Sequence, residues 1–118
     1  MISITCTITD KTAGPFQLAS LFTGGSVTGI TVAPAAGYPQ TKPSCTYLSI
    51  QADPLNGAGK IFRGDSKIAN DGSRQGKTLV AGDVDIQQTA GFNDVFLQSI
   101  FVNTDTNTSK FSVEISYK

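Results

Sequence analysis

Residues Ser49–Asp85 read SIQADPLNGAGKIFRGDSKIANDGSRQGKTLVAGDVD. Short runs that contain apolar residues alternate here with turn-forming groups, among them Asn56-Gly57, Asn70-Asp71-Gly72 and Ala81-Gly82-Asp83. Glycine and asparagine supply the positive φ that tight hairpin turns need. This spacing is typical of an antiparallel β structure. We therefore interpret the rest of the chain as packing partners for these strands.

Both ends of the chain show the period-two alternation of half-buried strands. At the N-terminal end, one face of residues 2–9 consists of Ile2, Ile4, Cys6 and Ile8. At the C-terminal end, one face of residues 110–118 consists of Phe111, Val113, Ile115 and Tyr117. The apolar run 94–103 is typical of a strand buried on both faces, and we expect it to form a closing hairpin with 110–118. The chain, 1–118, is thus predicted to be a single all-β domain, an antiparallel β-sandwich or jelly roll with almost no helix.

Two segments fit this scheme less simply. Residues 16–22 (FQLASLF) suit either one helical turn or a strand, and we expect a strand because no other segment indicates a helix. Residues 33–44 (APAAGYPQTKPS) contain three prolines, and proline lacks the N–H that a central strand needs. This Pro- and Gly-rich segment is predicted to be an ordered loop or arm outside the sheets.

The composition argues against several functional classes. Charged residues make up 15% of the chain and the formal net charge is zero. No overall field therefore draws the chain to nucleic acid or to an anionic membrane. The absence of histidine removes the Ser-His-Asp and Cys-His catalytic arrangements and the common zinc sites. Residues 1–10 lack the basic and apolar regions of a signal peptide, so we expect folding in a cytoplasm.

Cys6 and Cys45 are the two cysteines, and their separation matches no metal-binding signature. Cys6 belongs to the apolar row of the first predicted strand, which favours a buried position. We expect two reduced, buried thiols, with a Cys6–Cys45 disulfide as the alternative.

Two tripeptides resemble functional motifs but also have simpler structural explanations. Gly76-Lys77-Thr78 ends like a phosphate-binding loop, yet Asp71 occupies the position of the required first glycine and no helix is predicted to follow. Arg63-Gly64-Asp65 matches a tripeptide that adhesion receptors bind, although Gly64-Asp65 also forms a turn between strands. We expect neither nucleotide binding nor receptor adhesion from them.

Two sets of oxygen-bearing side chains are candidates for metal binding and for acid–base catalysis. Asn103, Asp105 and Asn107 alternate as at the start of a calcium loop, but a polar hairpin tip explains the same residues. Asp83 and Asp85 share one face of a strand, as paired catalytic carboxylates can, but exposed strand carboxylates are far commoner. We therefore expect no catalytic residue, no metal site and no cofactor.

From Ser49 onward, the order of strands and turns resembles small virion proteins of tailed bacteriophages. The matching pieces are Ser49–Ala52, Asn56-Gly57, Gly64-Asp65-Ser66, Leu79–Asp83 and Gln98–Tyr117. The resemblance implies a non-enzymatic structural role in the virion, as a capsid decoration or cement protein that binds the major capsid protein at the head surface. A tail, fibre or baseplate component with receptor or glycan contact is the alternative.

The resemblance to decoration proteins also implies a homo-oligomer, specifically a trimer. The candidate residues for partner contact are Phe16, Leu21, Phe22, Tyr38 in the arm, and the basic residues Arg63, Arg74 and Lys77. The basic residues are equally well explained as a solvated set of turns. A carbohydrate-binding sandwich unrelated to phages and an enzyme are the remaining classes, and the lack of tryptophan weighs against the former.

Overall fold

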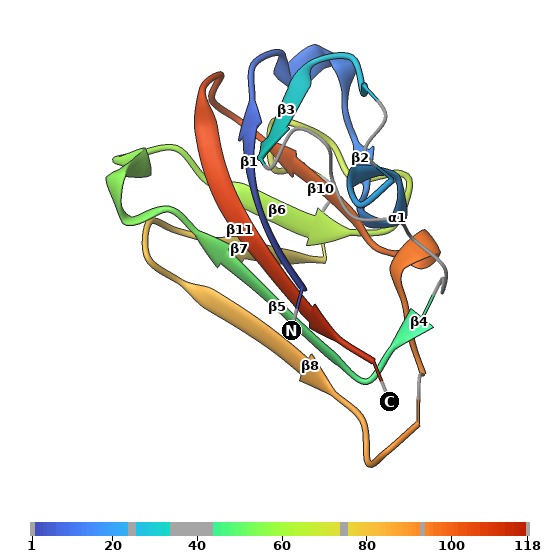
Figure 1. Cartoon of the computed structure of the whole chain (residues 1–118). Coiled ribbons are helices and arrows are strands. Elements are labelled where there is room, and N and C mark those ends of the chain that lie inside the picture. The colour runs from blue at the N-terminus through green and yellow to red at the C-terminus, as the bar shows by residue number, and fades with distance from the viewer. Residues whose placement is uncertain (1, 24–25, 34–43, 74–75, 93, 118) are drawn as a thin grey trace.

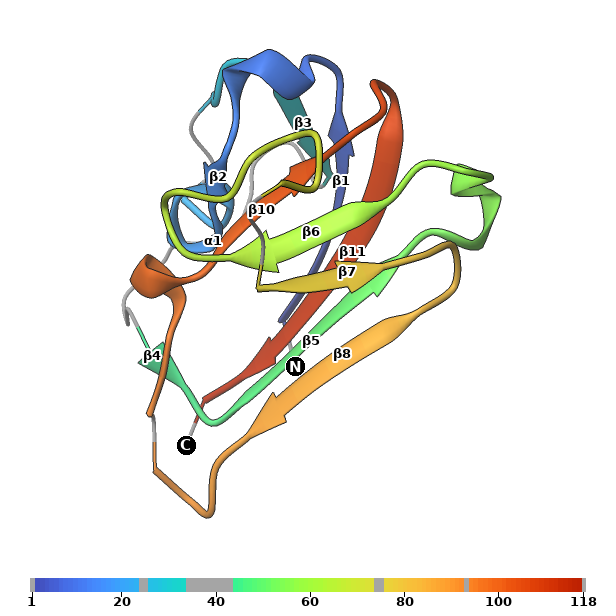
Figure 2. The same cartoon turned by 180° about the vertical axis from the view of Figure 1, so that it is seen from behind.

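The computed structural model describes residues 2–23, 26–33, 44–73, 76–92 and 94–117. Tyr38, Arg74 and most of the expected arm, 34–43, lie outside the described residues. Two antiparallel sheets face each other (Figures 1 and 2). One sheet has the strand order β3 (Ile30–Ala33), β1 (Ile2–Ile8), β11 (Ser109–Ser116), β5 (Tyr47–Ala52), β8 (Val84–Gln88). The other has the order β2 (Phe16–Gln17), β10 (Phe101–Thr104), β6 (Ile61–Gly64), β7 (Lys77–Leu79).

The remaining elements are short. Strands β4 (Ser44–Cys45) and β9 (Val95–Phe96) form a separate ribbon. One helical turn, α1, spans Leu18–Leu21, and the 3-10 turns are η1 (Lys11–Ala13), η2 (Pro54–Asn56) and η3 (Leu97–Ser99). Within the described residues, no helix has both the length and the apolar character needed to cross a membrane.

The strand pairing has the nested pattern of a jelly roll. β1 pairs with β11, β2 with β10, β5 with β8 and β6 with β7, all antiparallel. Strands near the two ends of the sequence therefore pair with each other, and strands near its middle pair with each other. This nested pairing wraps the chain into two Greek keys. β3 extends the first sheet beside β1. The all-β sandwich predicted from the sequence is confirmed.

The core lies between the facing sheets. Strands β1 and β11, which come from the two ends of the chain, contribute buried side chains to its centre. Cys6 on β1 stands opposite Phe111 on β11, and Ile4 stands opposite Val113. All four side chains are buried, as the period-two alternation predicted. Burial of each large apolar side chain contributes about 1.5–3 kcal/mol, so this central ladder is a main source of stability.

The expected strand at residues 16–22 is wrong beyond Gln17, where α1 begins. Leu18, Leu21 and Phe22 have the spacing of one helical face, and all three are buried. The Ser20 hydroxyl also donates a 2.9 Å hydrogen bond to Gln17 Oε1, and Leu18 N donates to the carbonyl of Ile100. Packing of that apolar face onto the core outweighs the strand preference of the neighbouring sequence.

The expected closing hairpin is also wrong, because β10 and β11 belong to different sheets. The apolar run 94–103 divides into β9, η3 and β10, so it is not one strand buried on both faces. Phe96 keeps 53% of its surface exposed. The polar turn between β10 and β11 crosses from one sheet to the other. Strand β10 pairs with β2 and β6 in the four-stranded sheet, whereas β11 pairs with β1 and β5 in the five-stranded sheet.

Both thiols are free and buried, as predicted. Burial raises the pKa of Cys6 to about 12 from the ordinary 9.0. Burial also raises the pKa of Cys45, partly offset by a hydrogen bond from the backbone of Tyr47. A thiol reagent at about pH 8 should therefore find little thiolate and little access in the native protein.

We predict that a chromogenic disulfide reagent modifies fewer than one thiol per chain in the native state and two after denaturation. The measurement is absorbance of the released chromophore with and without denaturant. The Cys45→Ser variant retains only the thiol of Cys6, so it shows which of the two thiols accounts for any reaction in the native state. Rapid native modification of Cys6 would contradict the burial that we describe.

Candidate functional site

Strand β8 places its charged side chain inside the sandwich and its apolar side chains outside. Asp85 stands opposite the buried Ile50 of β5, so both side chains are on the inner face. Val84 and Ile86 point to the other face and are 46% and 58% exposed. The expectation of an exposed Asp85 is therefore wrong. Strand β8 is an edge strand, and its inner face meets cations from the opposite sheet.

Asp85 binds two cations that come from the facing sheet. Arg63 Nη1 lies 2.7 Å from Asp85 Oδ2, and Lys77 Nζ lies 2.7 Å from Asp85 Oδ1. Arg63 Nη2 donates a further hydrogen bond to Gln87 Oε1. The side chain of Asp85 is 9% exposed, that of Arg63 20% and that of Lys77 54%. We call these four residues the inter-sheet cluster.

The inter-sheet cluster holds Asp85 in its ionised form. Burial on its own raises the pKa of this carboxyl, but the hydrogen bond from Lys77 and the charge of Arg63 outweigh burial. The pKa of Asp85 is therefore lower than its ordinary 3.8. Arg63 and Lys77 are also direct neighbours across β6 and β7 and repel each other, so a carboxylate between them relieves that repulsion.

Two glycines bring Arg63 and Lys77 side by side. Gly76 N donates a 3.0 Å hydrogen bond to the Arg63 carbonyl, and a Cβ on Gly76 would lie 2.7 Å from that oxygen. A Cβ on Gly64 would lie 2.3 Å from Ile68 Cγ2. Neither position has room for a side chain. This close approach of the chain before β7 to the end of β6 sets the two cations in register.

An open hollow of about 470 Å³ adjoins the inter-sheet cluster. Its lining consists of Arg63, Gly64, Gly76, Lys77, Asp85, Ser99 and Ile100. Gly64 and Gly76 contribute backbone to the wall, and Ser99 and Ile100 line the hollow from η3 and the residue after it. The hollow thus combines two cations, one carboxylate and a hydroxyl.

The two tripeptide motifs take part in this architecture. Arg63 of the Arg63-Gly64-Asp65 sequence turns inward to Asp85, and Asp65 accepts a 2.9 Å hydrogen bond from Lys67 N in the following turn. Gly76-Lys77-Thr78 leads into strand β7 and not into a helix. A phosphate loop needs the N-terminal amides of a helix, and that geometry does not occur at Gly76.

The oxygens considered for calcium do not converge. Asn103 Oδ1 accepts from Thr104 N, and Asn103 is buried. Asp105 Oδ1 accepts from Lys60 N, and Asn107 Oδ1 accepts from Lys11 N. Each oxygen therefore serves a separate backbone donor at this end of the sandwich. Within the described ranges, no group of three or more His, Cys, Asp or Glu side chains is arranged to hold a metal ion.

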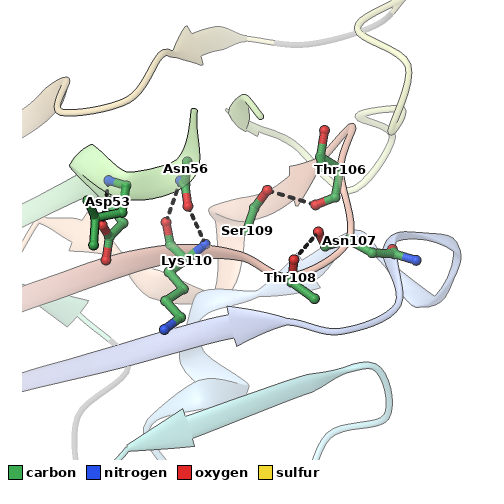
Figure 3. A pocket seen from close by; sticks show the side chains of 8 residues that line it. Asp53, Asn56, Thr106, Asn107, Thr108, Ser109 and Lys110 are labelled. Carbon is green, nitrogen blue, oxygen red and sulfur yellow. Dashed lines mark hydrogen bonds between the residues drawn. The ribbon is translucent and has the colours of Figure 1, made fainter. Parts of the chain in front are cut away.

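A second, smaller hollow of about 190 Å³ lies where the β5–β6 and β10–β11 connections meet (Figure 3). Asn56 exchanges two 2.8 Å hydrogen bonds with the backbone of Lys110. Ser109 donates to the Thr106 carbonyl and Thr108 to the Asn107 carbonyl. These polar groups bind one another and tie the loops to β11, so we assign this hollow a structural role.

The structure separates the predicted contact residues into three groups. Phe16, Leu21 and Phe22 are at most 2% exposed, so their predicted role in partner contact is wrong. Their spacing serves the core. Arg63 and Lys77 are brought together by the pairing of β6 with β7, and both bind Asp85, which the sequence indicates only as a neighbour of Asp83. Tyr38 and Arg74 lie outside the described residues.

The outer face of the five-stranded sheet is a broad surface of short polar side chains. It carries Ser3, Thr5, Thr7, Gln51, Ser112 and Ser116, with Lys110 and Glu114 as charges on β11. Tyr47 and Ser49 of β5 share this face, and Ser49 is buried there. Val84 and Ile86 continue it on β8, because Val84 stands opposite Gln51 and Ile86 opposite Ser49. Figure 1 looks onto this outer face, and no described helix or strand lies in front of it. On β1 and β11 the period-two alternation predicts this face as the outer one, opposite the buried apolar rows.

Comparisons with protein-family models, with curated proteins and with solved structures gave no significant match to this chain.

We predict that Asp85→Asn lowers the free energy of unfolding by about 2 kcal/mol, because it leaves two neighbouring cations without a counter-charge. The measurement is urea unfolding followed by fluorescence or circular dichroism. Since the folded pKa of Asp85 is depressed, its contribution is full at about pH 7 and declines as the pH falls below 3.8. The stability difference between wild type and variant should therefore shrink in acid.

Asp94→Asn is the matched control. Asp94 is exposed, and its substitution removes the same charge at a position outside the inter-sheet cluster. It should alter the free energy of unfolding by less than about 0.5 kcal/mol. Equal stability of the two variants at neutral pH would show that the inter-sheet cluster does not hold the sheets together.

Proposed function

We propose that the protein is a non-enzymatic structural component of a tailed-phage virion, a decoration or cement protein that binds the head surface. The observation that carries this proposal is the outer face of the five-stranded sheet. That face is broad, is almost free of charge, and ends in two exposed aliphatic side chains, Val84 and Ile86. Exposed apolar side chains beside a polar surface are typical of protein contact sites.

The order of turns and strands from Ser49 onward supports the same proposal through its resemblance to small phage virion proteins. Jelly rolls are common in viral capsid domains, although the fold alone does not define a function. In the described residues, the charged groups that cluster are used to join the two sheets. A structural protein of a virion needs a stable fold, which the joined sheets provide, and a surface that contacts its neighbours.

A tail or fibre role with glycan contact is the second candidate, and one observation favours it. Phe92 and Phe96 are 69% and 53% exposed, and both lie near the β4–β9 ribbon and not on the outer sheet face. Exposed aromatic rings provide large amphipathic contact surfaces. A glycan array tests this candidate directly, and loss of binding in Phe92→Ala and Phe96→Ala would support it.

We predict that the chain is present in purified virions and remains with the heads when heads and tails are separated. Quantitative mass spectrometry of each fraction gives the copy number per particle. A high, fixed copy number on heads supports decoration, and recovery with tails supports the second candidate. Absence from both fractions would refute the virion proposal.

We predict that Ile86→Lys reduces binding to undecorated heads by about tenfold, because a charge then enters the contact face. The measurement is co-sedimentation of purified protein with heads. Leu55→Lys is the control, since Leu55 is 93% exposed at the far η2 turn. Full occupancy of heads by Ile86→Lys would exclude this face as the contact. Light scattering of the free protein tests the proposed trimer.

A further inference from the structure

The inter-sheet cluster carries one more positive charge than its internal contacts neutralise. Asp85 has two oxygens, and one binds Arg63 while the other binds Lys77. Within the described residues, the second terminal nitrogen of Arg63 donates to the neutral amide of Gln87. Two cations therefore share one carboxylate. The arrangement leaves a net charge of one positive unit beside the hollow.

This excess charge lies in a place where water screens it incompletely. The guanidinium side of the inter-sheet cluster is largely covered, with Arg63 only 20% exposed, whereas Lys77 is 54% exposed and faces the open hollow. An ammonium group has three N–H donors, and Lys77 uses one of them on Asp85. Lys77 thus has donors left for a ligand that enters the hollow.

The charge and lining of the hollow favour an anion. Its volume of about 470 Å³ leaves room for a carboxylate group, and the backbone of Gly64 and Gly76 forms part of its wall. Ser99 adds a hydroxyl, and Ile100 adds an apolar contact for the carbon atoms behind a carboxylate. A second carboxylate would neutralise the excess charge and accept charge-assisted hydrogen bonds from Lys77 and Ser99.

We propose that the hollow is a binding site for the carboxylate of an acidic side chain on a partner protein. Lys77 is the principal donor, Ser99 the second donor, and Arg63 adds its positive charge from within the inter-sheet cluster. Assigning the side chain to a virion partner rests on the proposed function. The carboxylate site itself does not, because it follows from the charges and the hollow alone.

The test uses sodium acetate as the probe and the full chain labelled with ¹⁵N. Acetate is titrated against sodium chloride at equal ionic strength, and the amide signals of Gly64 and Gly76 are followed by NMR. We expect saturable shifts with acetate and none with chloride. Lys77→Gln should weaken the apparent affinity by about threefold to tenfold, and Ser99→Ala by a smaller factor.

Lys67→Gln is the matched control, because Lys67 is exposed in the same β6–β7 connection but does not line the hollow. It should bind acetate like the wild type. Shifts that do not saturate, that chloride reproduces, or that Lys77→Gln leaves unchanged would overturn the proposal. If Lys77→Gln fails to fold, the wild-type titration and Ser99→Ala still decide the question.

The acetate titration requires no virion, so its outcome is independent of the head-binding experiments. Saturable acetate binding by a protein that is absent from virions would retain the carboxylate site and reject the proposed function. Conversely, the protein could bind heads in the presence of acetate and show no amide shifts with acetate. That result would retain the decoration proposal and reject the carboxylate site.

Discussion

The pairing of the first strand with the last is the constraint on which the rest of the structure depends. β1 and β11 form the central ladder of the five-stranded sheet, with Ile4 opposite Val113 and Cys6 opposite Phe111. Every other strand of that sheet is positioned outward from this pair. Because the two strands come from opposite ends of the chain, the core closes only when most of the chain has been brought together.

At the edge of the sandwich where β7 and β8 lie, charge joins the two sheets beside the buried apolar side chain of Leu79. Asp85 points inward from edge strand β8, and Lys77 reaches it from edge strand β7. Inward-pointing charges on edge strands discourage the addition of further strands. The inter-sheet cluster therefore has two effects: it fastens the two sheets together, and it favours contact through sheet faces over contact through strand edges.

The division of roles between the two faces of the five-stranded sheet follows from this arrangement. Its inner face supplies the core, whereas its outer face presents Ser and Thr side chains together with Val84 and Ile86. An exposed face with little charge is suited to a matching protein surface, while the carboxylate site that we propose at Lys77 would add a point of charge recognition. Shape would then provide most of such a contact, and the single charged point would fix its orientation.

The sequence by itself determined the fold class, because period-two alternation and glycine turns with positive φ are local properties that survive any arrangement of the strands. It also placed Cys6 correctly, since that residue shares a row with Ile4 and Ile8. Only the tertiary structure decided that β10 and β11 enter different sheets and that Leu18, Leu21 and Phe22 form a buried helical face. It also decided that Asp85 lies inside. Alternation shows which residues share a face of a strand, but the face that becomes buried depends on the partners opposite it. For Asp85 those partners are Arg63 and Lys77, which only the packing of the second sheet brings within 2.7 Å.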